Sequence, residues 1–551
     1  MSNLMNNKHV KQILVLAVLS YCFLMLGNGV LSLTNPDEVF YSQTAKEMMQ
    51  KDTWMTPYLF GQPQFEKPIL TYWLLRTAFE VFGISSFSAR FFPALFGMFG
   101  VLAVYAFGLA AFKDSRRAMW AAFFMMSNNL YIGLSRTVFT DLFFSVFIFF
   151  SLASFFWGYA GRGKKGTGYF LFFVFSALAV LTKGPLGFLI PVLTVIVFLS
   201  IRRELKFLLC KEALYGFFAC CLVAVPWYAL MIKKYGAVFT QEFFYNDHVR
   251  RLLEAEHLGN DTWYFYPASI IGCMFPWSFY LLAGFGHWVR SLKRDATGFY
   301  LFLTCWVAVV LLVFQPAHSK LVSYIFPLFP ALALFLGDYV VSVLEAAKPP
   351  RSFYAAAWAT ALFFLFIPAG LFFATMYFSV YVVNATPVHL LICVFVFYLF
   401  WLFYFLMRRR FVLHLALTSL VLPVLLYFAF MVHEDFESYA SSKEACEFLT
   451  DNYRVDNTIL TAKFYARAVR FYTDKDVAVV DIGGKGYFSP HPIPYLNRHE
   501  MVADFLRRQP LTYAVLKKKG LKDLERVLDS EFTFEVLKVA GDEYVTRITK
   551  R

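Results

Sequence analysis

Two short motifs near the start of the chain contain the residue types that group-transfer chemistry needs. Asn35-Pro36-Asp37-Glu38 follows the first apolar segment, and Phe65-Glu66-Lys67-Pro68 comes soon after it. Ionisable groups beside membrane-spanning segments are costly, so they usually mark a functional site. A carboxylate can position or deprotonate an acceptor, and a lysine can hold a phosphate group. These motifs are therefore the first candidates for a site.

Further ionisable residues lie at the ends of other apolar segments, on the same predicted membrane face. They are Arg136, Asp141, Lys183, His248, Arg250, Arg251, His318 and Lys320. Such a mixture of carboxylates and cations fits transfer from a phosphate-bearing donor, because cations stabilise the leaving phosphate. The glycine spacing of Asp481-Ile482-Gly483-Gly484-Lys485-Gly486 fits no nucleotide-binding motif, and we interpret the segment as a turn. A polyprenyl-phosphate sugar is the donor that this chemistry and this membrane face indicate.

Most of these residues also have a purely structural explanation. Asp37 and Glu38 could cap a helix, and Glu66 with Lys67 could form a surface pair. Lys183 could extend its charge to the membrane interface, Arg250 and Arg251 could anchor lipid headgroups, and His248 could be a plain loop residue. Asp141 is harder to explain in this way, because a carboxylate at the start of a phenylalanine-rich span needs a partner. Arg136 is near enough in sequence to be that partner.

The composition indicates a polytopic membrane protein. Of 551 residues, 59% are hydrophobic, 20% are aromatic and 68 are Phe. The net charge of +14 does not indicate nucleic-acid binding, because the basic residues fall in short clusters at every second gap between apolar runs. The clusters are Lys8/Lys11, Lys113/Arg116/Arg117, Arg162/Lys164/Lys165, Arg202/Arg203/Lys206, Arg290/Lys293/Arg294, Lys348/Arg351 and Arg408/Arg409/Arg410. The positive-inside rule places them in the cytoplasm, together with the N-terminus.

Thirteen membrane spans are compatible with this alternation of charge. They lie at residues 12–32, 88–112, 118–135, 138–160, 168–182, 184–201, 213–232, 267–289, 297–315, 321–345, 353–378, 388–407 and 411–432. The polar stretch 33–87 has helical periodicity in Val39–Lys51 and Pro68–Phe82, which predicts amphipathic helices lying along the outer membrane surface. An odd number of spans with a cytoplasmic N-terminus puts the C-terminus on the outer side.

The last part of the chain predicts a second domain. Residues 1–432 form the membrane domain, whereas residues 433–551 alternate short apolar strands with amphipathic helices. The predicted strands are Thr458–Thr461, Val477–Asp481, Thr512–Leu516, Phe532–Val539 and Glu543–Ile548. The predicted helices are Ser442–Asp451, Arg467–Thr473 and Arg498–Arg508. This alternation is typical of a small α/β domain, here on the outer face.

These motifs together resemble the C-type (GT-C) membrane glycosyltransferases, above all the bacterial aminoarabinose lipid A transferases, which are related to the protein O-mannosyltransferases. The resemblance rests on the two motifs above and on Asp141, Leu181-Thr182-Lys183-Gly184, His248, Ser319-Lys320-Leu321 and Tyr324-Ile325-Phe326-Pro327. It implies an inverting glycosyltransferase of the bacterial inner membrane, with its C-terminal domain in the periplasm. The donor would be an undecaprenyl-phosphate-linked sugar and the acceptor lipid A or another periplasmic molecule, without nucleic acid; we expect a monomer in the lipid bilayer.

The resemblance also implies roles for individual residues. Asp37 would be the principal catalytic carboxylate and Asp141 the second, while Lys67 and an arginine of the Arg250/Arg251 pair would bind the donor phosphate. The cavity would also contain the residues Glu38, Arg136, Lys183, Lys320 and Tyr324. The chemistry would need no cofactor, although Glu66 and His248 could hold a structural divalent metal such as zinc. Two protein ligands do not complete a tetrahedral zinc site.

The chain departs from the family pattern at Val322, where the family commonly has proline two residues after the lysine. The local turn and the position of Tyr324 are therefore open. The sugar and the acceptor are open too: the same fold could move mannose or galacturonate to protein, lipopolysaccharide or glycan. A transporter or flippase is a more distant alternative, since it predicts charges near the membrane midplane rather than at the ends of spans.

Overall fold

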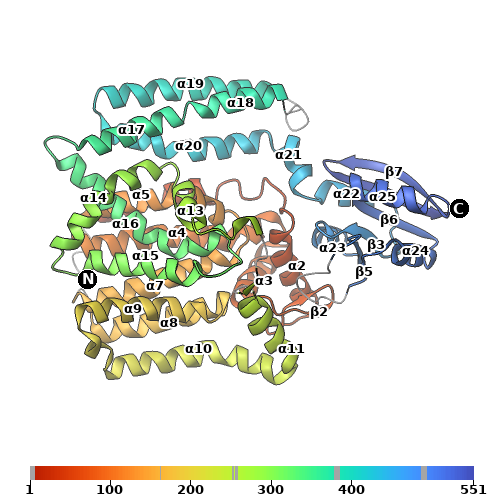
Figure 1. Cartoon of the computed structure of the whole chain (residues 1–551), viewed down its shortest axis with the longest axis horizontal. Coiled ribbons are helices and arrows are strands. Elements are labelled where there is room, and N and C mark those ends of the chain that lie inside the picture. Colours follow the sequence, from red (N-terminus) through yellow and green to blue (C-terminus); the bar gives the residue numbers. More distant parts are fainter. Residues whose placement is uncertain (1–6, 162, 251–252, 255–257, 378–384, 485–492) are drawn as a thin grey trace.

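The computed structural model describes residues 7–161, 163–250, 253–254, 258–377, 385–484 and 493–551. A bundle of long helices forms most of the molecule, and a six-stranded sheet with its own helices lies beyond one end of it (Figure 1). The N-terminus lies at the opposite end of the bundle (Figure 1). A layer containing helices α2 and α3 separates the bundle from the sheet.

Among the described residues, eight helices are long and apolar enough to cross a membrane, or nine if one bent pair is a single span. They are α4 (Ser86–Phe112), α7 (Thr140–Tyr159), α8 (Lys165–Lys183), α10 (Lys211–Tyr235), Val322–Glu345 (η4 and α16), Arg351–Tyr377 (α17 and α18), Thr386–Met407 (in α19) and α20 (Phe411–Met431). The helices α1 (Asn7–Leu24), α9 (Leu186–Arg202) and α15 (Phe299–Phe314) also match predicted spans. The chain is therefore a membrane protein with a largely helical fold.

Two further predicted spans are divided between separate helices. The segment 118–135 is divided into α5 (Ser115–Met126) and α6 (Asn129–Ser135), because the Asn128 side chain accepts a hydrogen bond from the backbone N–H of Tyr131 at 2.9 Å and starts a new helix. The segment 267–289 consists of α13 (Phe265–Cys273) and α14 (Ser278–Arg294), which meet at 112°. Pro276 lies between them and cannot donate a backbone hydrogen bond. Neither break was predicted from the sequence, and the count of thirteen spans stays a prediction.

Helices are present at both predicted places in the first polar stretch, as α2 (Asp37–Gln50) and α3 (Leu70–Phe82). Their predicted position along the membrane surface stays a prediction, and α2 is not amphipathic. A short hairpin of β1 (Tyr58–Leu59) and β2 (Gln62–Pro63) lies between them in sequence. Nearly all of α2 is buried, in a cluster that includes Trp227 of α10 and Phe471 of the C-terminal part. Helix α2 is thus packed between two parts of the protein.

The C-terminal segment folds as a sheet with helices on both faces. The strand order is β5-β4-β3-β6-β8-β7; β5, β4, β3 and β6 run parallel to one another, whereas β8 is antiparallel to both β6 and β7. The strands are β3 (Ile459–Ala462), β4 (Val477–Val480), β5 (Tyr495–Leu496), β6 (Leu511–Lys517), β7 (Phe532–Ala540) and β8 (Glu543–Lys550). The helices are α21 (His433–Ala440), α22 (Lys443–Asn452), α23 (Ala466–Thr473), α24 (His499–Arg507) and α25 (Lys518–Leu528). All five predicted strands and all three predicted helices are confirmed, whereas β5, α21 and α25 were not predicted.

Direct contacts connect this C-terminal part to the segment that contains Asp37. The Asn35 side chain donates to the Ser442 hydroxyl at 2.9 Å, and the Ser442 hydroxyl donates to the Glu543 carboxylate at 2.6 Å. In α2, the Lys46 ammonium group donates to the Phe471 carbonyl at 2.7 Å and pairs with Asp474 at 2.8 Å. The start of α2 is therefore fixed from the C-terminal side as well as from the bundle.

Glu543 makes this contact sensitive to pH. Burial, with the neighbouring charges of Asp542 and Glu444, raises the pKa of Glu543 to about 8, although Ser442 and Lys517 act in the opposite direction. Folding raises the pKa of Glu543 from an ordinary value near 4.5. The contribution of Glu543 to the free energy of unfolding is therefore complete below pH 4.5 and is lost as the pH rises through about 8. We expect the unfolding temperature of the wild-type protein to fall by several degrees between pH 6 and pH 9, and that of Glu543→Gln to change much less.

The measurement is thermal unfolding of the detergent-purified protein across this pH range. Glu535→Gln is the control, since Glu535 is exposed and pairs with Arg547. An equal pH dependence in Glu543→Gln and the control would contradict the assignment.

Candidate active site

A buried ion pair between Glu38 and Arg90 connects α2 to α4 at one end of the bundle. The Arg90 guanidinium donates to both Glu38 carboxylate oxygens, at 2.8 and 2.6 Å, and the two side chains are only 1% and 5% exposed. The remaining Arg90 N–H groups donate to the carbonyls of Asn28, Leu31 and Ser32. All five guanidinium donors are therefore used, which is the condition under which a buried arginine is tolerated.

Glu38 is equally well satisfied. It accepts hydrogen bonds from the backbone N–H and the hydroxyl of Thr34, at 3.0 and 2.9 Å, and from the backbone N–H of Val138 at 3.0 Å. Burial opposes ionisation of Glu38, but Arg90 and Thr34 outweigh it and hold the pKa of Glu38 below its ordinary value. The pair thus joins the segment before α2, helix α4 and the turn before α7.

Asp37 and Asp141 lie on either side of this connection and approach the same tyrosine. Asp37 is exposed in the first turn of α2, and Asp141 is 6% exposed in the first turn of α7. Burial raises the pKa of Tyr41 well above its ordinary value, and Tyr72 and the carboxylates of Asp141 and Asp37 raise it further. Both carboxylates are therefore close enough to Tyr41 to act on it electrostatically, although they are far apart in the sequence.

Asp141 has Lys183 as its ion-pair partner, at the end of α8. The Lys183 ammonium group also lies 4.2 Å from the ring centre of Tyr324, in η4 (Val322–Leu328). Helix α8 ends at this lysine because Gly184 adopts a φ of 93°, which favours glycine. The interpretation of Lys183 as a simple interface residue is thus wrong, and Tyr324 lies in the same cluster.

Arg136 does not pair with Asp141, so that prediction was wrong. Its guanidinium donates to the carbonyls of Phe23 and Leu26 at 3.1 and 2.7 Å, and it lies 5.1 Å from the ring centre of Phe430. The reason is that the last carbonyls of a helix lack partners within the helix, and Arg136 supplies donors at the end of α1. Arg136, Glu38 and Arg90 line a cavity of about 300 Å³ beside this end.

A second lysine with a carboxylate partner lies just before η4. Lys320 is 4% exposed and pairs with Asp261 at 2.6 Å, and the His318 ring pairs with the same carboxylate at 2.7 Å. The hydrogen bonds from Lys320 and His318 hold the pKa of Asp261 below its ordinary value. The buried charge of Lys320 is therefore neutralised by Asp261.

The second motif is also ordered and partly buried. Lys67 is 8% exposed, and its ammonium group donates to the Glu66 carbonyl at 3.1 Å. The Glu66 backbone N–H donates to the Gln64 side chain at 3.0 Å. Phe65 packs against the rings of Tyr235 and Phe239. The explanation of this motif as an exposed surface pair does not fit this burial.

Three predicted residues of the second polar loop are described only in part. Arg250, in the π-helix η2 (Gln241–Arg250), donates to the Glu254 carboxylate at 2.7 Å. Arg251 and the side chain of His248 lie outside the described residues. In the part of the chain that the structure describes, no group of three or more His, Cys, Asp or Glu side chains could hold a metal ion. Zinc binding by Glu66 and His248 therefore stays a prediction.

Four residues of the site were not found in the sequence: Arg90, Tyr41, Asp261 and Tyr266. Tyr266 is fully buried near Tyr324 and Asp141. Arg90 had a signal, because it is a lone charge near the start of the predicted span 88–112, where an ionisable residue usually has a function. The other three lie among many similar tyrosines and loop carboxylates, and their sequence context does not separate them.

Removal of Arg90 tests the connection that it forms. Arg90→Met leaves Glu38 buried without its counter-charge, which typically costs about 3–5 kcal/mol. We expect a large decrease in the unfolding temperature of the detergent-purified protein, and a partial recovery in the double variant Arg90→Met/Glu38→Met.

Arg116→Gln is the control, because Arg116 is 62% exposed and such surface pairs contribute at most about 1 kcal/mol. If Arg90→Met were no less stable than this control, the buried pair would not stabilise the contact between α2 and α4.

Comparison with known proteins relates this arrangement to a family. Residues 10–238 match the family model described as dolichyl-phosphate-mannose-protein mannosyltransferase. An undecaprenyl phosphate-alpha-4-amino-4-deoxy-L-arabinose arabinosyl transferase of Edwardsiella ictaluri is 30% identical over 331 residues, which are 59% of this chain and 58% of the relative. A transferase of the same name from Serratia proteamaculans is 30% identical over 61% of this chain and 60% of the relative. The alignment thus spans about three fifths of the length of these curated relatives.

Solved structures share the fold over nearly the whole chain. The crystal structure of ArnT from Cupriavidus metallidurans bound to undecaprenyl phosphate superposes with a TM-score of 0.79, at 19% identity, over 97% of both chains. The archaeal oligosaccharyltransferase AglB from Archaeoglobus fulgidus gives a TM-score of 0.53, at 14% identity, over 98% of this chain and 74% of AglB. The chain therefore has the fold of these glycosyltransferase structures, a helical bundle followed by an α/β sheet, and it is similar in sequence to the aminoarabinose transferases over about three fifths of its length.

Proposed function

We propose that this protein transfers a sugar from undecaprenyl phosphate to an acceptor at the outer face of the bacterial inner membrane. The observation that carries the proposal is that Asp37 and Asp141 approach one tyrosine while Lys183 pairs with Asp141. Among the protein's relatives, the curated transferases act on 4-amino-4-deoxy-L-arabinose by name, and the ArnT structure contains undecaprenyl phosphate. We therefore propose 4-amino-4-deoxy-L-arabinose as the sugar and lipid A as the acceptor.

The transfer that we propose exchanges one carbon–oxygen bond for another. An oxygen of the acceptor attacks the anomeric carbon, the bond from that carbon to the donor phosphate oxygen breaks, and undecaprenyl phosphate leaves. Attack from the face opposite the leaving group inverts the anomeric configuration. We assign Asp37, which is exposed, to contact with the acceptor or the sugar. It removes a proton if the acceptor is a hydroxyl, and only orients the reactants if the acceptor is an ionised phosphate.

We assign some of the other residues to direct contact with the substrates and others to positioning of the contacting residues. We assign Lys67 with Arg250 or Arg251 to the donor phosphate, where cations stabilise the leaving group. Lys183, Lys320 and Tyr324 complete the cavity around Asp141. Glu38 and Arg136 act as positioning residues, because their polar groups are occupied by Arg90, Thr34 and Val138 and by the end of α1. Structural zinc at Glu66 and His248 is a separate proposal, which elemental analysis of the purified protein tests.

The membrane orientation belongs to the same proposal. We propose thirteen spans in residues 1–432, a cytoplasmic N-terminus and a periplasmic domain at 433–551. The basic clusters support this orientation, because they lie in alternate connections between helices. The location of the sheet beyond the bundle end opposite the N-terminus also supports it (Figure 1). Transfer of mannose or galacturonate on the same fold is the alternative, whereas the family match does not favour a transporter or flippase.

Substitution of Asp37 tests the reaction in cells. We expect lipid A from cells that lack the protein to be without a pentosamine adduct, and re-expression of the wild type to restore it. Asp37→Asn should leave less than about 1% of the product, because general acid–base groups contribute about 10²–10⁴-fold to rate. Mass spectrometry of purified lipid A is the measurement, and Asp456→Asn, an exposed carboxylate in the C-terminal part, is the matched control. Full activity of Asp37→Asn would remove the catalytic assignment.

Topology reporters test the orientation independently of catalysis. An alkaline phosphatase fusion after Met431 should be active and a fluorescent-protein fusion at the same position should be dark, since the first requires the periplasm and the second the cytoplasm. Fusions after Met407 should give the reverse pattern. A cytoplasmic signal after Met431 would overturn both the topology and the choice of donor.

A further inference from the structure

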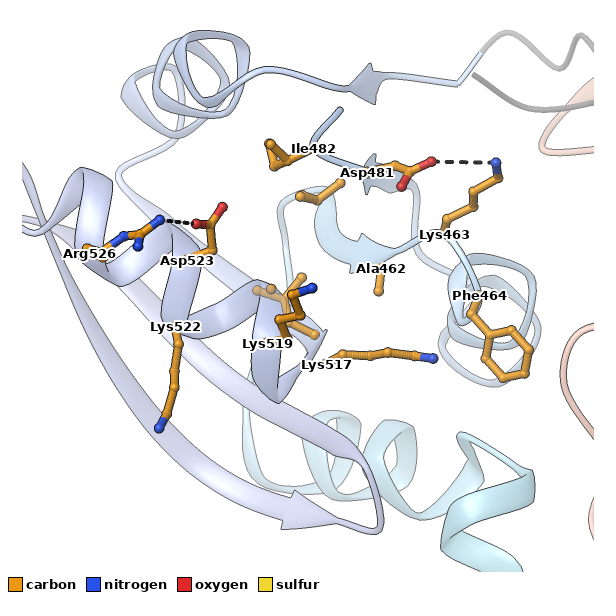
Figure 2. A pocket seen from close by; sticks show the side chains of 13 residues that line it. Ala462, Lys463, Phe464, Asp481, Ile482, Lys517, Lys519, Lys522, Asp523 and Arg526 are labelled. Atoms are coloured by element: carbon orange, nitrogen blue, oxygen red, sulfur yellow. Dashed lines mark hydrogen bonds and ion pairs between the residues drawn. The ribbon is translucent and has the colours of Figure 1, made fainter. Parts of the chain in front are cut away.

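The C-terminal sheet contains a cavity of about 770 Å³ that the proposed transfer reaction does not use. It lies at the carboxyl ends of β3, β4 and β6, and Figure 2 shows the side chains that line it. Strand β3 is parallel to β4 on one side and to β6 on the other. Helices α22 and α23 cover one face of these strands, and α24 and α25 cover the other. The chain therefore leaves β3 and β6 toward opposite faces, which creates the kind of crevice where open α/β sheets bind ligands.

The lining of this cavity is strongly basic. Three separate segments contribute its cations: Lys463 after β3, Lys517 at the end of β6, and Lys519, Lys522 and Arg526 on α25. Lys519, Lys522 and Arg526 are spaced to share one face of that helix. Among the lining residues that the structure describes, the carboxylates are Asp481 and Asp523.

These two carboxylates do not neutralise the whole cluster. Asp481 pairs with Lys463 at 3.5 Å, and Asp523 pairs with Arg526 at 2.8 Å (Figure 2). Asp523 also contacts the His499 ring at 2.7 Å. Lys519 and Lys522 have no ion-pair partner among the residues that the structure describes. An excess of cations at one edge of a sheet attracts an anion.

Backbone groups and an aromatic ring add to this site. The first N–H groups of α25 have no acceptor within the helix, and they lie beside Lys519 and Gly520 in the lining. Phe464 is 41% exposed at the cavity, and the Lys517 ammonium group lies 4.8 Å from its ring centre. An exposed ring gives the C–H face of a sugar an apolar surface, while the cations and N–H groups suit a phosphate.

We propose that this cavity binds a phosphorylated sugar, with the phosphate at Lys519 and the first N–H groups of α25, the sugar ring against Phe464, and Lys522 as a further positive charge on the same helix. The volume is within the range of small-molecule sites. This binding site is separate from Asp37 and Asp141, and the proposal does not depend on the transfer reaction.

Equilibrium dialysis with radiolabelled glucosamine 1-phosphate tests the proposal on the full-length protein in neutral detergent. We expect saturable binding that weakens as salt is raised, and no binding of glucosamine without phosphate. The double variant Lys519→Gln/Lys522→Gln should bind about tenfold more weakly or worse, because the charge-assisted hydrogen bond of Lys519 and a second positive charge of the lining are lost. The matched control Lys443→Gln/Lys475→Gln removes the same charge from residues outside the lining and should bind as the wild type does.

Two further arms separate this site from the transfer site and identify the ligand source. Lys67→Ala should retain glucosamine 1-phosphate binding if the signal comes from the C-terminal cavity. Vesicles that contain a phosphorylated glucosamine disaccharide lipid should displace the probe if the natural ligand is a lipid headgroup, and should leave it bound if the ligand is soluble; both results support the phosphosugar class. Absence of saturable binding, equal binding by the two double variants, equal binding of unphosphorylated glucosamine, or loss of binding in Lys67→Ala would overturn the proposal.

Discussion

The arrangement of the segments around α2 depends above all on the buried pair of Glu38 and Arg90. A buried ion pair gains little net stability, because removal of two charges from water offsets most of their attraction. This pair is tolerated because every donor of Arg90 is used and Glu38 accepts five hydrogen bonds from three segments. Its consequence is positional: the residues on either side of these segments, Asp37 and Asp141, are held near one tyrosine.

The same segment is also fixed from the C-terminal side. Asn35 contacts Ser442, the Leu33 N–H donates to the Tyr472 hydroxyl at 3.2 Å, and Lys46 contacts the end of α23. Helix α2 and the residues before it thus contact both the helical bundle and the α/β part. The proposed active site lies at this junction and not deep in the bundle, as suits a donor whose lipid chain stays in the bilayer while its sugar faces the outer compartment.

The sequence predicts the parts of this fold that have regular periodicity. The helices α2 and α3 and the five C-terminal strands follow from apolar spacing, and the long spans follow from hydropathy. The breaks at Asn128 and Pro276 were missed because a window of apolar residues does not register a side-chain cap or a missing N–H. Helix α25 was missed although Leu521, Leu524 and Leu528 have helical spacing and are buried, because its start is rich in lysine and glycine.

The sequence identified several residues of the candidate site but not their ion-pair partners. Asp37, Asp141, Lys183 and Tyr324 were identified from motifs, but the partner of Asp141 was assigned to Arg136 from sequence proximity alone. The structure pairs Asp141 with a lysine from the next span, and Arg136 with carbonyls at the end of α1. Contacts between segments that are far apart in the chain depend on the packing of the bundle, which no local pattern specifies.

The most direct test of the account is a transfer assay in proteoliposomes that contain the purified protein, an undecaprenyl-phosphate-linked aminoarabinose donor and lipid A. We expect undecaprenyl phosphate and glycosylated lipid A to appear in equal amounts, with the anomeric configuration of the transferred sugar inverted. Release of undecaprenyl phosphate with no glycosylated lipid A, or glycosylated lipid A with retained configuration, would contradict it.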